Sequence, residues 1–114
     1  MTTLYGIRNC DTVRKARAWL DAHGVAYRFH DYKTAGIDAV TLNGWIDALG
    51  WEALLNRAGT TFRTLSEDQR VDLDRDRAVA LMLAHPSLIR RPVLADADGF
   101  EIGFKTERYA ARLG

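Results

Sequence analysis

The alternation of apolar and polar positions divides the chain into short strands and helices. Residues 3–7 are rich in strand-forming side chains and run into a polar, turn-prone segment, which predicts a strand followed by a loop. Over residues 12–23 the apolar positions recur at helical spacing, and Gly24 ends the pattern. We expect Asp11 or Asn9 to cap the start of this helix.

The next segments complete one βαβ unit and then become helical. Residues 25–32 alternate apolar and polar side chains, which predicts a second strand parallel to the first. From residue 37 to about 85 the periodicity is mostly helical, with Gly50 and Gly59 as dividers and with helices expected at 40–49, 51–55 and 75–84. The alternating charges of residues 67–77 are typical of a solvated helix face.

After Pro86 the pattern returns to that of strands. Residues 92–95 and 100–104 flank an Asp-Gly pair at 98–99, which predicts an antiparallel hairpin, and a helix at 106–113 follows. This order predicts an α/β protein with a thioredoxin-like fold. Its sheet would be mixed and four-stranded, with a helical insertion between the βαβ and ββα halves.

Length and charge limit the further classes. The 114 residues suit a single domain, 1–114, with the insertion at about 37–88. A formal net charge of +1 gives no general reason to bind nucleic acid or a membrane surface. Because we find neither an apolar stretch of about 20 residues nor a signal-peptide pattern, we expect a cytoplasmic protein, and we expect a monomer.

Cys10, the only cysteine, is the main candidate for chemistry. It lies between a predicted strand and a predicted helix, where unpaired amides and the helix dipole favour a thiolate. The alternative is a small buried hydrophobic residue, but its neighbours on both sides are polar. Val13 stands where a Cys-x-x-Cys motif would place a second thiol, so an external thiol such as glutathione must resolve any adduct.

Arg91 is the second candidate. It precedes Pro92 at the start of a predicted strand, and we expect this X-Pro bond to be cis and the guanidinium to lie near Cys10. The alternative is that Arg90 and Arg91 are solvated surface charges.

The other notable side chains have simpler interpretations. The three tryptophans, at positions 19, 45 and 51, lie among Ala and Leu and are expected in the core. The histidines at positions 23, 30 and 85 are expected at the surface or at helix caps.

Several motifs together resemble the arsenate-reductase-related family that includes ArsC, Spx and YffB, with YffB-like proteins the most similar. The similarity lies in residues 3–12, 15–20, 31–33, 50–57, 59–61, 86, 89–93 and 102–105. It implies a thioredoxin-like fold with a helical insertion. It also implies a catalytic cysteine at Cys10, which in the arsenate reductases attacks arsenate before glutathione and glutaredoxin complete the reduction.

The resemblance also implies a set of anion-binding residues. Arg91 matches one of the three arginines that surround the oxyanion in the arsenate reductases, Lys105 falls where a second is expected, and the third corresponds to the neighbourhood of Asn56 and Arg57. Beside the cysteine, Arg8 and Thr12 complete the expected anion or substrate-binding set, and Asp11 and Pro92 are expected to shape the site. We expect neither a metal nor a bound cofactor, with glutathione as co-substrate and glutaredoxin as a further partner.

Two departures favour a substrate other than arsenate. Asp11 places a negative charge beside the anion site, and Lys105 lacks the planar fork of arginine. We therefore expect a glutathione-dependent thiol reductase, with an arsenate reductase proper or a non-enzymatic, Spx-like regulatory protein as the alternatives. Val13 argues against the Spx alternative, because that regulator uses a dithiol switch.

Overall fold

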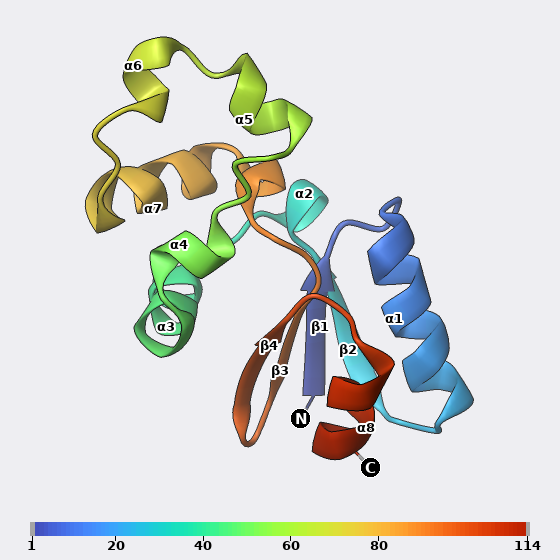
Figure 1. Cartoon of the computed structure of the whole chain (residues 1–114). Helices are drawn as coiled ribbons and strands as arrows, with labels where there is room; N and C mark the ends of the chain where they lie inside the picture. The colour runs from blue at the N-terminus through green and yellow to red at the C-terminus, as the bar shows by residue number, and fades with distance from the viewer. Residues whose placement is uncertain (1, 114) are drawn as a thin grey trace. The chain divides into compact units, whose positions relative to one another are not determined.

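A computed structural model describes residues 2–113, which divide into two compact units (Figure 1). The first unit combines the residues up to Ala35 with those from Arg91 onward, and the second is Gly36–Arg90. The second unit has nearly the bounds of the expected helical insertion, while the assignment of one domain stays a prediction. Among residues 2–113 we find no helix long and apolar enough to span a membrane.

A four-stranded sheet forms the centre of the first unit. Its strands lie in the order β2-β1-β3-β4, with bounds Tyr27–Asp31, Thr2–Gly6, Val93–Asp96 and Gly99–Ile102. β1 and β2 are parallel, whereas β3 is antiparallel to both β1 and β4. The sheet is therefore mixed, and the α/β, thioredoxin-like prediction is confirmed.

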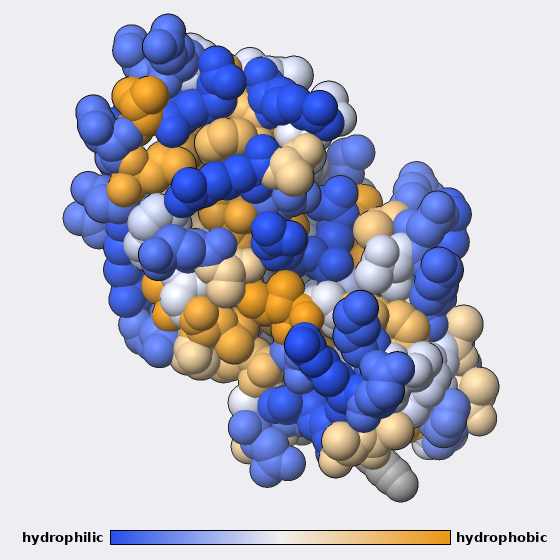
Figure 2. Space-filling model, in the orientation of Figure 1, coloured by the Kyte–Doolittle hydropathy of each residue, from blue (hydrophilic) through white to orange (hydrophobic). Residues whose placement is uncertain are grey.

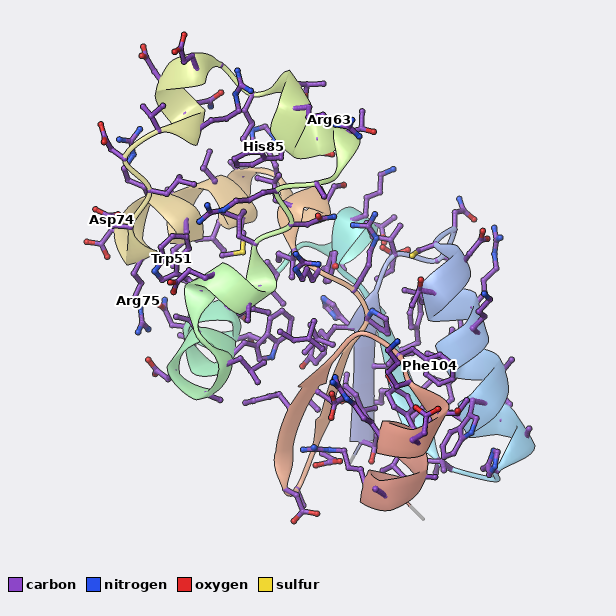
Figure 3. The ribbon with its side chains drawn as sticks, viewed as in Figure 1. Trp51, Arg63, Asp74, Arg75, His85 and Phe104 are labelled. Carbon is purple, nitrogen blue, oxygen red and sulfur yellow. The ribbon has the colours of Figure 1, made fainter. Side chains whose placement is uncertain are left out.

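Two helices pack on this sheet through one shared core. They are α1 (Asp11–Ala22) and α8 (Thr106–Leu113), and the core residues come from β1, α1, β3 and α8, namely Leu4, Ala16, Leu20, Leu94 and Tyr109. Phe104 packs edge-on against Tyr109, with ring centroids 4.8 Å apart, and lies beside α8 in Figure 3. Burying each large apolar side chain stabilises the unit by about 1.5–3 kcal/mol.

A largely buried ion pair also fastens α8 to the sheet. Arg112 donates to both carboxylate oxygens of Asp96 at the end of β3, at 2.5 and 3.1 Å. Burial opposes ionisation of Asp96, but the hydrogen bond from Arg112 lowers the pKa of this carboxyl below its ordinary value. The pair therefore orients the last helix on the hairpin.

The second unit consists of short helices. They are α3 (Ala39–Leu49), α4 (Trp51–Leu54), α5 (Thr60–Thr64), α6 (Glu67–Arg70), α7 (Arg75–Ala84) and the 3₁₀ helix η1 (Pro86–Leu88). Gly50 and Gly59 separate them as expected. Trp45 is buried in α3, whereas Trp51 on α4, labelled in Figure 3, is half-buried, so the core prediction holds fully for Trp45 alone. Trp19, in the first unit, is also only partly buried.

The prediction of one solvated helix face at 67–77 is wrong. α6 ends at Arg70, and Asp72 then takes a positive φ of 51°. The Asp74 carboxylate accepts the Arg77 amide at 2.8 Å and starts a separate helix. The segment is nevertheless mostly exposed, and hydrophilic residues predominate over α6 in Figure 2.

The second strand is shorter than the predicted 25–32. It ends at Asp31, and Tyr32 begins the short helix α2 (Tyr32–Ala35). The Asp31 carboxylate accepts the backbone N–H of Lys33 at 3.0 Å and so diverts the chain into a helical turn. The alternation of apolar and polar residues does not reveal this hydrogen bond, so it does not predict where the strand ends.

Candidate active site

A tight turn places Cys10 at the start of α1. The Cys10 N–H donates to the Ile7 carbonyl at 3.1 Å, and the Cys10 carbonyl accepts the first helical bond from Arg14 at 2.9 Å. Cys10 is thus the N-cap, and the expectation that Asp11 or Asn9 caps the helix is wrong. Asp11 is already the first helical residue, and Asn9 lies within the turn.

Asp31 holds this turn against the neighbouring strand. Its register partner is Gly6, the last residue of β1, and its carboxylate accepts the Arg8 N–H at 3.2 Å. The other carboxylate oxygen binds the Lys33 amide in α2. One side chain therefore fixes both the cysteine turn and the start of α2.

Val13 fills the position where a second thiol would stand in a dithiol enzyme. Its side chain is fully buried, and its Cγ2 lies 2.8 Å from where a Cβ on Gly6 would be. The first turn of α1 therefore packs tightly on the end of β1, and Cys10 is the sole thiol of the chain.

The surroundings of the Cys10 sulfur favour its charged form. Partial burial raises the pKa of the thiol, but the Val13 amide, the Arg91 side chain and the Thr12 amide together outweigh it and lower the pKa below the ordinary value. The Cys10 side chain makes no N-cap hydrogen bond, and the two amides nevertheless lower the pKa of the thiol. Cys10 is half-buried, which leaves the thiol accessible.

Arg91 lies beside the thiol, as the sequence predicts. The Arg91–Pro92 peptide bond is cis, and Arg91 is half-buried whereas Arg90 is exposed. The guanidinium interacts with the Cys10 sulfur and also with the hydroxyl of Tyr32. The alternative of two solvated arginines is therefore wrong for Arg91.

Tyr32 is the site residue that the sequence did not predict. Its side chain is completely buried, and its hydroxyl lies near both Arg91 and the Cys10 sulfur. Burial raises the pKa of Tyr32 well above the usual range, so the phenol stays neutral. Residues 31–33 are among the segments that resemble the family, and this resemblance could have pointed to Tyr32. The alternation of apolar and polar residues instead assigned Tyr32 to a strand.

The other predicted site residues are Thr12, Arg8, Lys105 and Arg57, and no side-chain contact with the Cys10 sulfur is described for any of them. Thr12 contributes its backbone amide, and the Arg8 and Lys105 side chains are exposed, the latter just before α8. Arg57 belongs to the second unit, where its guanidinium lies 5.5 Å from the centroid of the Trp51 ring. Their substrate-binding roles stay predictions.

The negative charge of Asp11 should affect the thiol less than its sequence position next to Cys10 suggests. Its carboxylate is highly exposed and accepts a hydrogen bond from Arg14 at 2.9 Å. The charges of Arg14 and Asp11 therefore largely cancel each other at the thiol.

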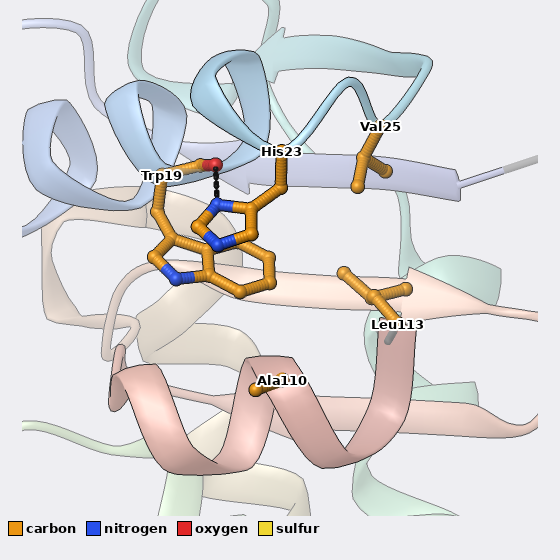
Figure 4. A pocket seen from close by; sticks show the side chains of 5 residues that line it. All are labelled: Trp19, His23, Val25, Ala110 and Leu113. Carbon is orange, nitrogen blue, oxygen red and sulfur yellow. Dashed lines mark hydrogen bonds between the residues drawn. The ribbon is translucent and has the colours of Figure 1, made fainter.

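A separate pocket lies at the other end of α1. It has a volume of about 180 Å³, and its lining residues are Trp19, His23, Val25, Ala110 and Leu113 (Figure 4). The His23 ring stacks on Trp19 at 3.9 Å, and its Nδ1 lies 2.8 Å from the Trp19 carbonyl. Trp19, the lining residue nearest to Cys10 in the sequence, lies more than two helical turns along α1 from it, so the pocket is not part of the thiol site.

The histidines follow the expectation in two of three cases. His23 and His85 are exposed at helix C-caps, whereas His30 is half-buried with its ring 5.2 Å from that of Tyr5. Within residues 2–113 no group of three or more His, Cys, Asp or Glu side chains is arranged to hold a metal ion.

The fold and the site define a thioredoxin-like protein with a single thiol at the start of its first helix. The ArsC family matches residues 5–112, and the chain belongs to this family.

Solved and curated relatives agree with this assignment. A solved protein named YFFB is 55% identical, covers 100% of both chains and superposes with a TM-score of 0.97. An arsenate reductase (ArsC) related protein from Brucella melitensis is 53% identical over 98% of this chain and 93% of its own, with a TM-score of 0.77. The global transcriptional regulator Spx of Streptococcus agalactiae is 31% identical over 99% of this chain and 83% of the regulator.

Proposed function

We propose that this protein is a glutathione-dependent thiol reductase in which Cys10 is the nucleophile. The observation that carries the proposal is the half-buried thiol whose pKa is lowered by the Val13 and Thr12 amides and by Arg91. A thiolate at neutral pH is the reactive form of cysteine, and a disulfide is its natural electrophile. The similarity to arsenate reductase related proteins supports the same chemistry.

The reaction proceeds by two thiol–disulfide exchanges. The Cys10 thiolate attacks the glutathione sulfur of a mixed disulfide, forms a new S–S bond and releases the substrate as a thiolate that takes up a proton. A glutathione thiolate then attacks the adduct, which frees Cys10 and yields oxidised glutathione. Over both steps, the sulfur of the incoming glutathione is oxidised from thiol to disulfide and the substrate sulfur is reduced from disulfide to thiol, while the other glutathione sulfur stays in a disulfide.

The charged residues have complementary roles in this proposal. Arg91 stabilises the thiolate before attack and after release, while the positive charges of Lys105 and Arg8 attract the anionic substrate and the Thr12 hydroxyl offers it a hydrogen bond. Because Cys10 is the only cysteine of the sequence, the chain has no internal resolving thiol, so an external thiol closes the cycle.

A regulatory function is the second candidate, because the Spx relative covers nearly the whole chain. In that case Cys10 would accept glutathione once, as a redox-sensitive contact, without turnover. The arsenate alternative uses the same thiolate on a different electrophile.

The test is mass spectrometry of the intact protein after incubation with oxidised glutathione, with Cys10→Ser as the control. We expect one adduct of glutathione mass on the wild type, none on the variant, and reversal by reduced glutathione. Consumption of NADPH with glutathione reductase and bis(2-hydroxyethyl) disulfide then measures turnover. An adduct without turnover would favour the regulatory function, and no adduct would contradict both.

A further inference from the structure

Tyr32 is a fully buried phenol set beside charged groups. It begins α2 directly after Asp31, whose carboxylate binds the Lys33 amide on one side and the Arg8 amide of the cysteine turn on the other. The Tyr32 backbone is therefore tied to the turn that carries Cys10. Its hydroxyl reaches the Arg91 guanidinium, which also interacts with the Cys10 sulfur.

The chemistry of this contact sets its direction. A guanidinium has donors only, so the Tyr32 oxygen accepts the hydrogen bond from Arg91. A carboxylate at the same place would hold the guanidinium too, but it would cancel much of the positive charge that acts on sulfur. A neutral phenol positions the charge without cancelling it.

The rigid Tyr32 side chain restricts the conformations of the more flexible Arg91 side chain. An arginine side chain has several freely rotating bonds and about 2 kcal/mol of rotamer entropy to lose when it is fixed. Tyr32 has two side-chain torsions, and complete burial fixes both of them. A fixed acceptor thus restricts Arg91 to orientations near the thiol.

We infer that Tyr32 is a positioning residue, whose hydroxyl holds the Arg91 guanidinium beside the Cys10 sulfur. Its effect on the thiolate does not depend on the substrate, whereas its effect on the binding of anionic disulfides rests on the proposed function. The proposal differs from a packing role, in which the Tyr32 ring alone would matter.

Tyr32→Phe removes the hydroxyl and keeps the ring. Tyr109→Phe is the matched control, because Tyr109 is also completely buried in the first unit and its hydroxyl binds the Gly103 carbonyl at 3.4 Å. The measurement is the rate of Cys10 alkylation by iodoacetamide against pH, which reports one thiol because the chain has one cysteine.

We expect Tyr32→Phe to raise the alkylation midpoint and to slow alkylation about threefold at pH 6.5, in proportion to the lost thiolate. Tyr109→Phe should leave the midpoint unchanged. In an Arg91→Ala background, Tyr32→Phe should add no further change, because Tyr32 acts through the guanidinium.

Two results would overturn the inference: an unchanged midpoint in folded Tyr32→Phe, or an equal rise in the midpoint with and without Arg91. If Tyr32→Phe does not fold, NMR of the wild-type Arg91 side chain decides instead. Slow rotation of the guanidinium supports positioning, and free rotation contradicts it. Iodoacetamide requires no glutathione, so a failure of the glutathione adduct would remove the proposed function while the midpoints still decide the role of Tyr32.

Discussion

At the scale of single residues, Cys10 occupies a place that a small oxygen-bearing side chain normally takes. The N-cap of a helix favours Ser, Thr, Asp or Asn because their oxygens bind the amides of the first turn. The sulfur of Cys10 faces the same amides without a close capping bond. The residue therefore gives up part of the stabilisation of a cap and gains an activated thiol.

Cys10→Ser restores a capping oxygen and removes the ionisable thiol, so the free energy of unfolding should differ between the variant and the wild type in a pH-dependent way. The folded pKa of Cys10 is lowered, so the stabilising effect of its thiolate is fully present above the unfolded value of about 8.5 and is lost as the pH falls through the folded pKa. Serine stays neutral and caps at every pH. We expect the variant to be more stable by up to about 1 kcal/mol at pH 5.5.

This advantage of the serine variant should shrink as the pH rises to 9. The measurement is urea unfolding of both proteins at several pH values, with Cys10→Ala as a control that neither caps nor ionises. A difference that does not change with pH would show that the thiol ionises equally in the folded and unfolded chains.

Cys10 and Arg91 were predictable because each carries its chemistry in the local sequence, one after a strand and one before a proline. Tyr32 was not, because its importance comes from two residues distant in sequence. Alternation alone assigns a tyrosine after a strand to that strand, whereas the Asp31 carboxylate turns it into the first residue of a helix.

At the scale of elements, the placement of α1 depends on how closely its first turn packs on β1. The Cβ of an alanine at position 6 would lie 2.8 Å from Val13 Cγ2, closer than such atoms normally approach. Valine is branched at Cβ and fully buried here, so it cannot rotate away without disturbing its neighbours. Gly6 therefore sets the distance between the strand and the helix that carries Cys10.

Gly6→Ala should destabilise the protein by about 1–3 kcal/mol through overpacking. Gly44→Ala is the contrasting control, since Gly44 lies inside α3 with no atom within 4 Å of its added Cβ and should gain about 0.5–1 kcal/mol. Denaturant unfolding of both variants measures the change in the free energy of unfolding, which should be a loss for Gly6→Ala and a gain for Gly44→Ala. A neutral Gly6→Ala would mean that the helix shifts on the sheet at little cost.

Helix bounds were predictable where several signals coincide; of the very short helices only α4, predicted at 51–55 and found at Trp51–Leu54, was anticipated. α7 and α8 have the predicted bounds, because helical spacing and end signals such as the cap at Asp74 agree. Helices of four or five residues, such as α2, α5 and α6, contain little more than one turn and show no periodicity. The capping box between Ser66 and Gln69 was a readable sign of α6 that the charge pattern obscured.

At the scale of the whole molecule, charge is arranged in local pairs that the net value conceals. A formal charge of +1 includes Asp11 with Arg14, Asp47 with Arg75 and Asp96 with Arg112, each an ion pair in the structure. Composition excluded a general anion-binding surface and could not identify which cation faces the thiol. That information came from the strand order, which places Arg91 near the end of β1.

The charges near the thiol should decide which substrate the protein prefers. Arsenate reduction, if present, should be slow compared with glutathione-linked disulfide exchange, because Lys105 offers a point charge where a planar fork suits a tetrahedral oxyanion. Asp11 should contribute less, because Arg14 already pairs with its exposed carboxylate. We therefore expect Lys105→Arg to raise arsenate turnover more than Asp11→Gly does, and the double variant to raise it most.

The measurement is steady-state arsenate reduction with glutathione and glutaredoxin, for the wild type, both single variants and the double variant. Exchange with bis(2-hydroxyethyl) disulfide, which is neutral, serves as the control and should change little, because it depends on the Cys10 thiolate and not on an oxyanion site. Rapid wild-type arsenate turnover that neither substitution improves would instead make arsenate the substrate, with the existing lysine sufficient to hold it.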